Sequence, residues 1–100
     1  MFESGVLYTG SAKVKGVWNE TGIGADDNLV GDDMVCSECV VMASIDNAGR
    51  LWVKPYGVAD EDDGVPLDGG DAVNFTVTNL NQIHVNVIAD GDKVIVIYSI

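Results

Sequence analysis

Hydrophobic and polar residues alternate with a period of two over much of the chain, as in the segment Val73–Val77. This alternation is typical of β-strands with one buried face, and no segment of useful length carries the apolar stripe of an amphipathic helix. The pattern predicts strands at Gly5–Thr9, Ala12–Trp18, Val35–Ile45, Arg50–Lys54, Ala72–Thr78, Ile83–Ala89 and Val94–Ser99, with a further short strand at Leu29–Val30. About seven to eight antiparallel strands in 100 residues predict one all-β domain, 1–100, with a β-sandwich or jelly-roll-like fold.

Residues rich in Gly, Asp and Asn separate the predicted strands. Gly10-Ser11 and Asp46–Gly49 are expected to close hairpins. Asp90–Asp92 is expected to close the last hairpin, because an Asp-Gly pair accommodates the positive φ angles of a tight turn. Two longer acidic stretches, Asn19–Asp33 and Tyr56–Asp71, are predicted to be loops.

The last predicted strand is apolar on both faces. Val94, Val96 and Tyr98 form one face, and Ile95, Ile97 and Ile100 are assigned to the other. A strand of this kind must be covered twice, and in a two-layer sandwich the core provides one cover. The second cover is either another subunit or the loops of the same domain. We expect a subunit contact at the isoleucine face.

The charge of the chain is strongly acidic. Sixteen Asp and Glu oppose five Lys and Arg, which gives a formal net charge of −11, while 47% of the residues are hydrophobic. The apolar content predicts a folded core, and the acidic surface argues against nucleic acid and anionic membranes as partners. Most of the acid is Asp. Such a surface fits a halophilic source, where salt screens the repulsion, or an ordinary hydrated exterior.

Two further features bear on where the protein resides. The N-terminus, Met1–Gly5, carries neither the basic nor the apolar region of a secretory signal, so none is expected. The apolar runs stay well below the ~20 residues that span a bilayer.

Candidate chemistry is sparse. Cys36 and Cys39 stand three residues apart, but an extended strand points such residues to opposite faces, so we expect neither a disulfide nor a metal between them. His84 has no placed nucleophile and is expected at the surface or an interface. Asp60–Asp63 departs from the calcium-loop pattern and is expected to be a solvated run of charge. The sequence therefore predicts a non-enzymatic protein without catalytic residues, metal or cofactor.

The aromatic residues allow two interpretations. Trp18, Trp52, Tyr8, Tyr56 and Tyr98 all lie within or beside predicted strands. They could form a sugar-binding platform on a β-sandwich, but aromatic side chains in strands also simply pack. Packing in the core or in an interface is favoured.

The order of motifs from Cys36 to the end is similar to that of a known group of proteins. The motifs are Asp46-Asn47-Ala48-Gly49-Arg50-Leu51-Trp52-Val53, then Val65-Pro66-Leu67-Asp68-Gly69-Gly70-Asp71-Ala72-Val73, then Val77-Thr78-Asn79-Leu80-Asn81-Gln82-Ile83-His84-Val85, and finally Gly91-Asp92-Lys93-Val94. This order resembles small β-rich virion proteins of tailed viruses. The match covers roughly the C-terminal two thirds of the chain and departs from the pattern at Lys54-Pro55 and in the acidic insertion Ala59–Gly64.

The resemblance implies a non-enzymatic structural protein at the virion surface, either a capsid decoration or a turret subunit. Its partners would be copies of itself, expected as a homotrimer, and a major capsid or other virion protein. With the acidic composition, the host would be a halophile such as a haloarchaeon. The alternative is a carbohydrate- or receptor-binding β-sandwich module, including a tail-associated one, that uses Trp18, Trp52 or Tyr56.

Overall fold

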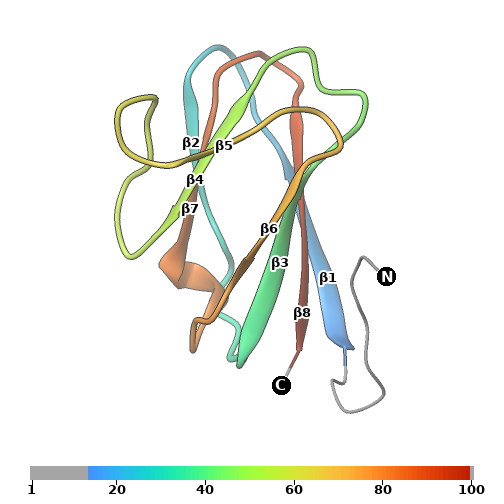
Figure 1. The fold of residues 1–100 in the computed structure, drawn as a ribbon, viewed down its shortest axis with the longest axis vertical. Coiled ribbons are helices and arrows are strands. Elements are labelled where there is room, and N and C mark those ends of the chain that lie inside the picture. Colours follow the sequence, from blue (N-terminus) through green and yellow to red (C-terminus); the bar gives the residue numbers. More distant parts are fainter. Residues whose placement is uncertain (1–13, 100) are drawn as a thin grey trace.

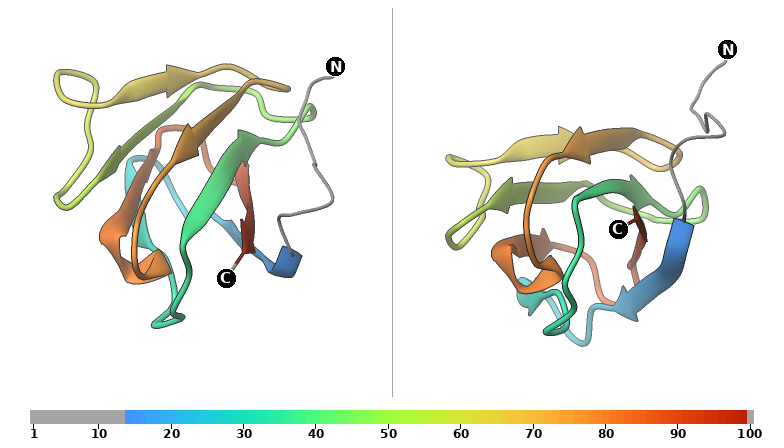
Figure 2. Two further views of the ribbon diagram at one scale, coloured as in Figure 1. Left: turned by 60° about the horizontal axis from the view of Figure 1, so that its bottom comes forward. Right: turned by 90° about the horizontal axis from the view of Figure 1, so that it is seen from below.

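Two four-stranded antiparallel sheets stack face to face to form a β-sandwich (Figures 1 and 2). The structure, a computed structural model, describes residues 14–99. The strands are β1 Val14–Thr21, β2 Asp27–Val30, β3 Glu38–Ala43, β4 Leu51–Pro55, β5 Val65–Leu67, β6 Ala72–Phe75, β7 Ile83–Val87 and β8 Lys93–Ser99, and a 3-10 turn, η1, spans Leu80–Gln82. The predicted all-β sandwich is therefore confirmed.

Successive strands mostly lie in opposite sheets. Sheet A has the order β1-β8-β3-β6 and sheet B the order β2-β7-β4-β5. Among the described strands, only β4 and β5 are consecutive and pair with each other. The predicted hairpins at Asp46–Gly49 and Asp90–Asp92 are wrong, because both connections cross from one sheet to the other. Their turn residues do reverse the chain, and Gly91 has the expected positive φ of 87°. Turn chemistry specifies a reversal but not the sheet in which the next strand pairs.

Several predicted boundaries also change. β1 continues to Thr21, which lies in the predicted loop, since β1 pairs with β8 along its whole length. β3 begins only at Glu38, and Val35 forms an isolated bridge with Asn79. β5 lies within the predicted loop Tyr56–Asp71. The predicted strand Gly5–Thr9 and the turn at Gly10-Ser11 lie outside the described residues.

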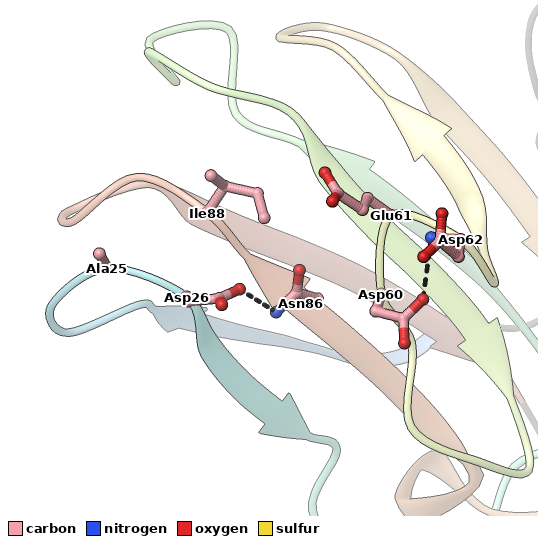
Figure 3. Close-up of a pocket in the computed structure, with 7 residues that line it drawn as sticks. All are labelled: Ala25, Asp26, Asp60, Glu61, Asp62, Asn86 and Ile88. Atoms are coloured by element: carbon pink, nitrogen blue, oxygen red, sulfur yellow. Dashed lines mark hydrogen bonds between the residues drawn. The ribbon is translucent and has the colours of Figure 1, made fainter.

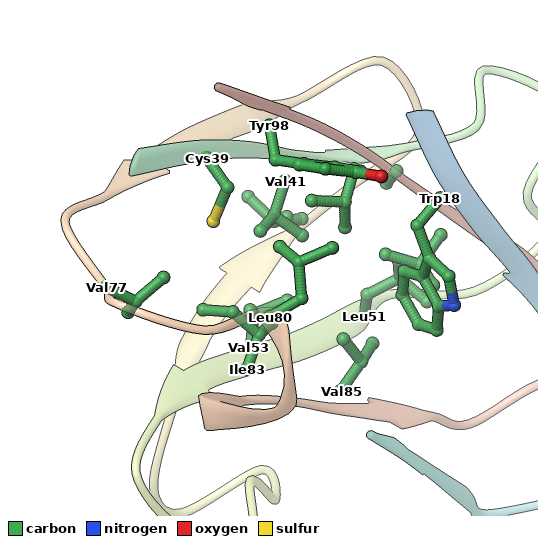
Figure 4. Close-up of a cluster of buried hydrophobic side chains, with 14 of the residues drawn as sticks. Trp18, Cys39, Val41, Leu51, Val53, Val77, Leu80, Ile83, Val85 and Tyr98 are labelled. Carbon is green, nitrogen blue, oxygen red and sulfur yellow. The ribbon is translucent and has the colours of Figure 1, made fainter. Parts of the chain in front are cut away.

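The core fills the space between the sheets (Figure 4). Sheet A contributes Val41, Val94, Val96, Cys39, Tyr98 and Trp18, and sheet B faces them with Leu51, Leu67, Val53, Ile83, Val85 and Val87. Each such side chain contributes roughly 1.5–3 kcal/mol when fully buried. Ile45, the last residue of the predicted strand Val35–Ile45, is 80% exposed, because β3 has already ended at Ala43.

Two loops at one end of the sandwich are joined through a buried carboxylate. Asp92 is only 4% exposed, and its two oxygens accept hydrogen bonds from the backbone N–H groups of Ala48 at 2.8 Å and Gly49 at 2.7 Å. Asn47 adds a bond from its side-chain amide to the carbonyl of Lys93 at 2.9 Å. These contacts hold the β3–β4 connection against the β7–β8 connection.

Candidate functional site

The outer side of sheet A carries a continuous apolar surface. Its residues are Val17 on β1, Val40 and Met42 on β3, and Ile95 and Ile97 on β8; we call them the sheet A face. The register places Val17 beside Ile97 and Ile97 beside Val40, while Ile95 lies beside Met42. Side chains at directly opposed positions on one face of a sheet touch each other, so the five form one patch.

This surface belongs to the outside of the domain. Val94, Val96 and Tyr98 point from β8 into the core, and the intervening Ile95 and Ile97 therefore point away from it. Val17 is 57% exposed, and the other four residues of the sheet A face are half-buried. A monomer thus leaves β-branched and thioether side chains on the outer side of sheet A in contact with water.

Charge is nearly absent from the outward positions of sheet A. Among the described strand side chains on this side, only Lys93 and Glu38 are charged. They lie at opposite ends of the sheet, because Lys93 pairs with Thr21 and Glu38 pairs with Ser99. Although the chain has a net charge of −11, Glu38 is therefore the one carboxylate among the described outward strand positions of sheet A.

The predicted interface residues lie partly where the sequence suggests. Ile95 and Ile97 are on the sheet A face, whereas Ile100 lies outside the described residues. Val17, Val40 and Met42 were not predicted as members of the patch. Alternation along β3 could have suggested an outward Val40 and Met42, but only strand pairing shows that they adjoin Ile95 and Ile97.

The outer side of sheet B is polar by comparison. His84 and Asn86 alternate with the buried Ile83 and Val85, so both point outward from β7, as the alternation predicts. Lys54 and Val30 flank His84 on the neighbouring strands. No hydrogen bond or ion pair joins the His84 side chain to another described residue, and nothing in the arrangement supplies a nucleophile beside it.

The aromatic residues do not form one platform. Trp18 and Tyr98 are buried in the core, Trp52 is half-buried on the outer side of sheet B, and Tyr56 is 67% exposed in the loop after β4. Tyr8 lies outside the described residues. Of the predicted sugar-binding set, only Trp52 and Tyr56 remain on the described surface.

An ion pair borders Trp52. The guanidinium carbon of Arg50 lies 5.7 Å from the centre of the Trp52 ring, within the range of a cation–π contact. Arg50 Nε also donates to Asp68 Oδ1 at 2.8 Å. That hydrogen bond, followed by the charge of Arg50, lowers the pKa of Asp68, and Asp68 in turn raises the pKa of Arg50. Arg50 therefore already contacts both Trp52 and Asp68.

The two cysteines lie in the core. Cys36 precedes β3 and is 6% exposed, and Cys39 on β3 is 1% exposed. The expectation that they point to opposite faces is wrong, because residue 36 lies outside the regular strand and turns inward to contact the Val77 carbonyl. Burial away from water, followed by the proximity of Cys36 and Glu38, raises the pKa of Cys39 to about 12.

Metal and membrane features can be checked for the part of the chain that the structure describes. Within residues 14–99, no group of three His, Cys, Asp or Glu side chains is arranged to hold a metal ion. In the same range, no helix has the length and hydropathy to cross a bilayer.

Asp60–Asp63 is an exposed acidic loop, and Asp63 accepts a bond from Lys54 Nζ. This agrees with the predicted solvated run of charge.

Comparison with protein-family models, with curated proteins and with solved structures found no match to this chain. By its fold and its surface, the protein is an acidic β-sandwich with one apolar outer sheet face.

Proposed function

We propose that this protein is a non-catalytic structural subunit of a virus particle, of the capsid decoration or turret type, that associates with copies of itself through the sheet A face. The observation that carries the proposal is the apolar patch of Val17, Val40, Met42, Ile95 and Ile97 on the outer side of sheet A. The motif order after Cys36 supports the virion assignment, and the acidic remainder of the surface suits a hydrated particle exterior.

The physical driving force is burial of the patch. Covering apolar surface contributes about 25 cal/mol per Å² before the costs of association are subtracted. β-branched side chains on a rigid sheet lose little conformational freedom on contact, because their χ1 angles are already restricted. The patch is therefore suited to adhesion.

The charges at the ends of sheet A favour a second copy as the occupant. Lys93 and Glu38 have opposite sign and lie at opposite ends of the patch. A second copy laid across the patch with its strands reversed brings the Lys93 of each copy near the Glu38 of the other. Such a contact is two-fold and self-complementary. The homotrimer implied by the resemblance stays a prediction, and the mass of the assembly distinguishes a two-fold dimer from a trimer.

Carbohydrate or receptor binding is the alternative function. It rests on Tyr56, which is exposed, and on Trp52, which is half-buried beside Arg50. Trp18 cannot stack on a sugar from its place in the core. A change of Trp52 fluorescence on adding glycans would favour this alternative.

The test replaces Ile95 and Ile97 with Thr and compares sedimentation velocity of variant and wild-type protein. Thr retains β-branching and outward positions tolerate a hydroxyl, so the domain stays folded. Each substitution removes about 1 kcal/mol of buried apolar transfer free energy at the contact. Because a two-fold contact carries both substitutions from both copies, about 4 kcal/mol is lost and association weakens roughly a thousandfold.

A matched control replaces Ile23 and Ile45 with Thr. These residues are 83% and 80% exposed in loops, so the same chemical change is made away from the patch. The control should sediment as wild type. If the Ile95/Ile97 variant assembles as well as the control, or if wild type stays monomeric at high salt and concentration, the proposed contact is wrong.

A further inference from the structure

A pocket of about 470 Å³ opens on the outer side of sheet B, on the other side of the sandwich from the sheet A face. Three segments form it (Figure 3): the β1–β2 loop, the acidic loop after β4, and the end of β7. Its lining residues are Ala25, Asp26, Asp60, Glu61, Asp62, Asn86 and Ile88. A cavity of this volume holds an amino-acid side chain or a small polar molecule.

The floor of the pocket holds a buried amide that is only half satisfied. Asn86 is 3% exposed, and its Nδ2 donates to Asp26 Oδ1 at 3.1 Å and to Asn28 Oδ1 at 3.3 Å. Its Oδ1 accepts no hydrogen bond from any residue in the described range, and it points into the space between Ile88, Glu61 and Asp60 (Figure 3). Buried carbonyl oxygens are normally paired, so this oxygen is an acceptor available to a donor that enters the pocket.

The walls of the pocket are negatively charged, and the described residues that line it supply no counter-ion. Four of its seven lining residues are acidic and none is basic. The two basic side chains with ion pairs nearby are engaged elsewhere, Lys54 with Asp63 and Arg50 with Asp68. Like charges around one hollow repel each other, and a bound cation relieves that repulsion.

Local structure holds the carboxylates in place. Asp26 has a positive φ of 63°, and its N–H donates to the Ile88 carbonyl at 3.1 Å, which fixes the β1–β2 loop against the end of β7. Asp60 Oδ1 accepts from the Asp62 N–H at 2.9 Å, while paired backbone bonds between Asp60 and Asp63 close the opposite loop. The two acidic groups therefore approach Asn86 from separate, tethered loops.

We propose that this pocket binds the guanidinium group of an arginine side chain presented by a partner protein. A guanidinium carries a permanent positive charge and five planar N–H donors, which match carboxylate oxygens on two sides and the Asn86 carbonyl on the floor. A metal ion fits less well, since the described carboxylates do not converge as a metal-ligand set. The proposal is independent of association through the sheet A face.

The test titrates ¹⁵N-labelled protein with N-acetyl-arginine methylamide at about 0.15 M salt, where screening suppresses long-range attraction to the chain's net charge. Saturable shifts are expected at the Asn86 side-chain amide and at the backbone of Asp26 and Glu61. The citrulline analogue has nearly the same shape without the charge and should give no saturable shift. Equal responses to both compounds, or competition by Mg²⁺ at an equal concentration, would overturn the proposal.

Variants then localise the binding. Asp26→Asn with Glu61→Gln removes two charges from the pocket, and Asn tolerates the left-handed backbone at position 26. This pair should weaken the arginine probe about tenfold or more, as expected for lost charge-assisted hydrogen bonds. The control pair, Asp32→Asn with Asp46→Asn, removes the same charge from exposed positions outside the pocket and should bind as wild type.

A second variant keeps the test decisive if the pocket pair folds poorly. Ala25→Arg adds a side chain at an exposed lining position, where it can place its own guanidinium in the pocket. This variant should fold and should no longer bind the probe. Unchanged probe binding by Ala25→Arg, or equal losses in the pocket pair and the control pair, contradicts the proposal.

Discussion

Replacing Asp92 with Ala is expected to destabilise the domain even though it lowers an excess of negative charge. At a net charge of −11, removal of a carboxylate would by itself relieve repulsion. Asp92 is buried, however, and its two oxygens accept the backbone N–H groups of Ala48 and Gly49 at 2.8 and 2.7 Å. In the Ala variant both N–H groups lose a charged acceptor.

The expected loss of stability in Asp92→Ala follows from those two hydrogen bonds. A hydrogen bond to a charged group contributes about 1.5–3 kcal/mol, so two give about 3–6 kcal/mol. Ala48 is exposed, and water can replace part of its bond, which places the expected loss near the lower end, at about 3 kcal/mol. For a domain of this size, that loss lowers Tm by roughly 12–24 °C.

The assay is thermal and urea unfolding of the Asp92→Ala variant beside an Asp46→Ala control. Asp46 is exposed in the same connection and its carboxylate accepts no bond from the described residues, so its removal should change stability by less than about 0.5 kcal/mol. The stability of Asp92→Asn should fall between those of the two variants. Its amide oxygen can still accept one backbone N–H group, but its amide nitrogen is a donor and faces the other N–H group. If Asp92→Ala is no less stable than Asp46→Ala, the argument that Asp92 joins the two connections is refuted.

Two further predictions concern the core. Gly31→Ala should lower the free energy of unfolding in urea by roughly 1–3 kcal/mol or more, because an added Cβ would overlap the Leu80 carbonyl. Gly57→Ala is the control, since its Cβ would meet only the flexible end of Lys54. Equal losses in the two variants would refute the steric argument at Gly31. The Cys39 thiol should resist alkylation at pH 8 until the protein unfolds, because burial raises its pKa to about 12. Since the pKa of Cys39 is raised on folding, the stability that the neutral thiol contributes is complete below about pH 9 and is lost as the pH rises toward 12. The unfolding midpoint of the wild type should therefore fall across this window, and Cys39→Ala should reduce that fall. A midpoint that is flat across the window, or a pH dependence unchanged by Cys39→Ala, would contradict the raised pKa.

The period-two pattern was sufficient to predict the fold class, and it assigned the faces of β8 and most of β3. Cys39, Val41 and Ala43 alternate into the core as the pattern requires. The pattern failed at β5, where Val65-Pro66-Leu67 reads as loop because of its proline and acidic surroundings. β5 is an edge strand, and proline is tolerated there since one side of the strand needs no donor.

Sheet membership could not be predicted from local residues. Whether β3 and β4 pair or stack depends on how two apolar faces are buried against each other, which is a property of the whole domain. The sheet A face therefore emerged only with the register that places Met42 beside Ile95. The acidic pocket depends in the same way on three segments distant in sequence, and nothing around Asn86 in the sequence indicates that its side chain is buried.

Methyl-selective NMR of the wild-type protein over a range of protein concentrations tests most directly whether the sheet A face is the contact. At high salt, we predict concentration-dependent shifts and broadening at the methyl groups of Val17, Val40, Met42, Ile95 and Ile97. The methyl groups of Ile23, Ile45 and Ile88, which lie elsewhere on the surface, should remain unchanged. Spectra that do not depend on concentration, or changes centred on those three isoleucines instead, would contradict association through this face.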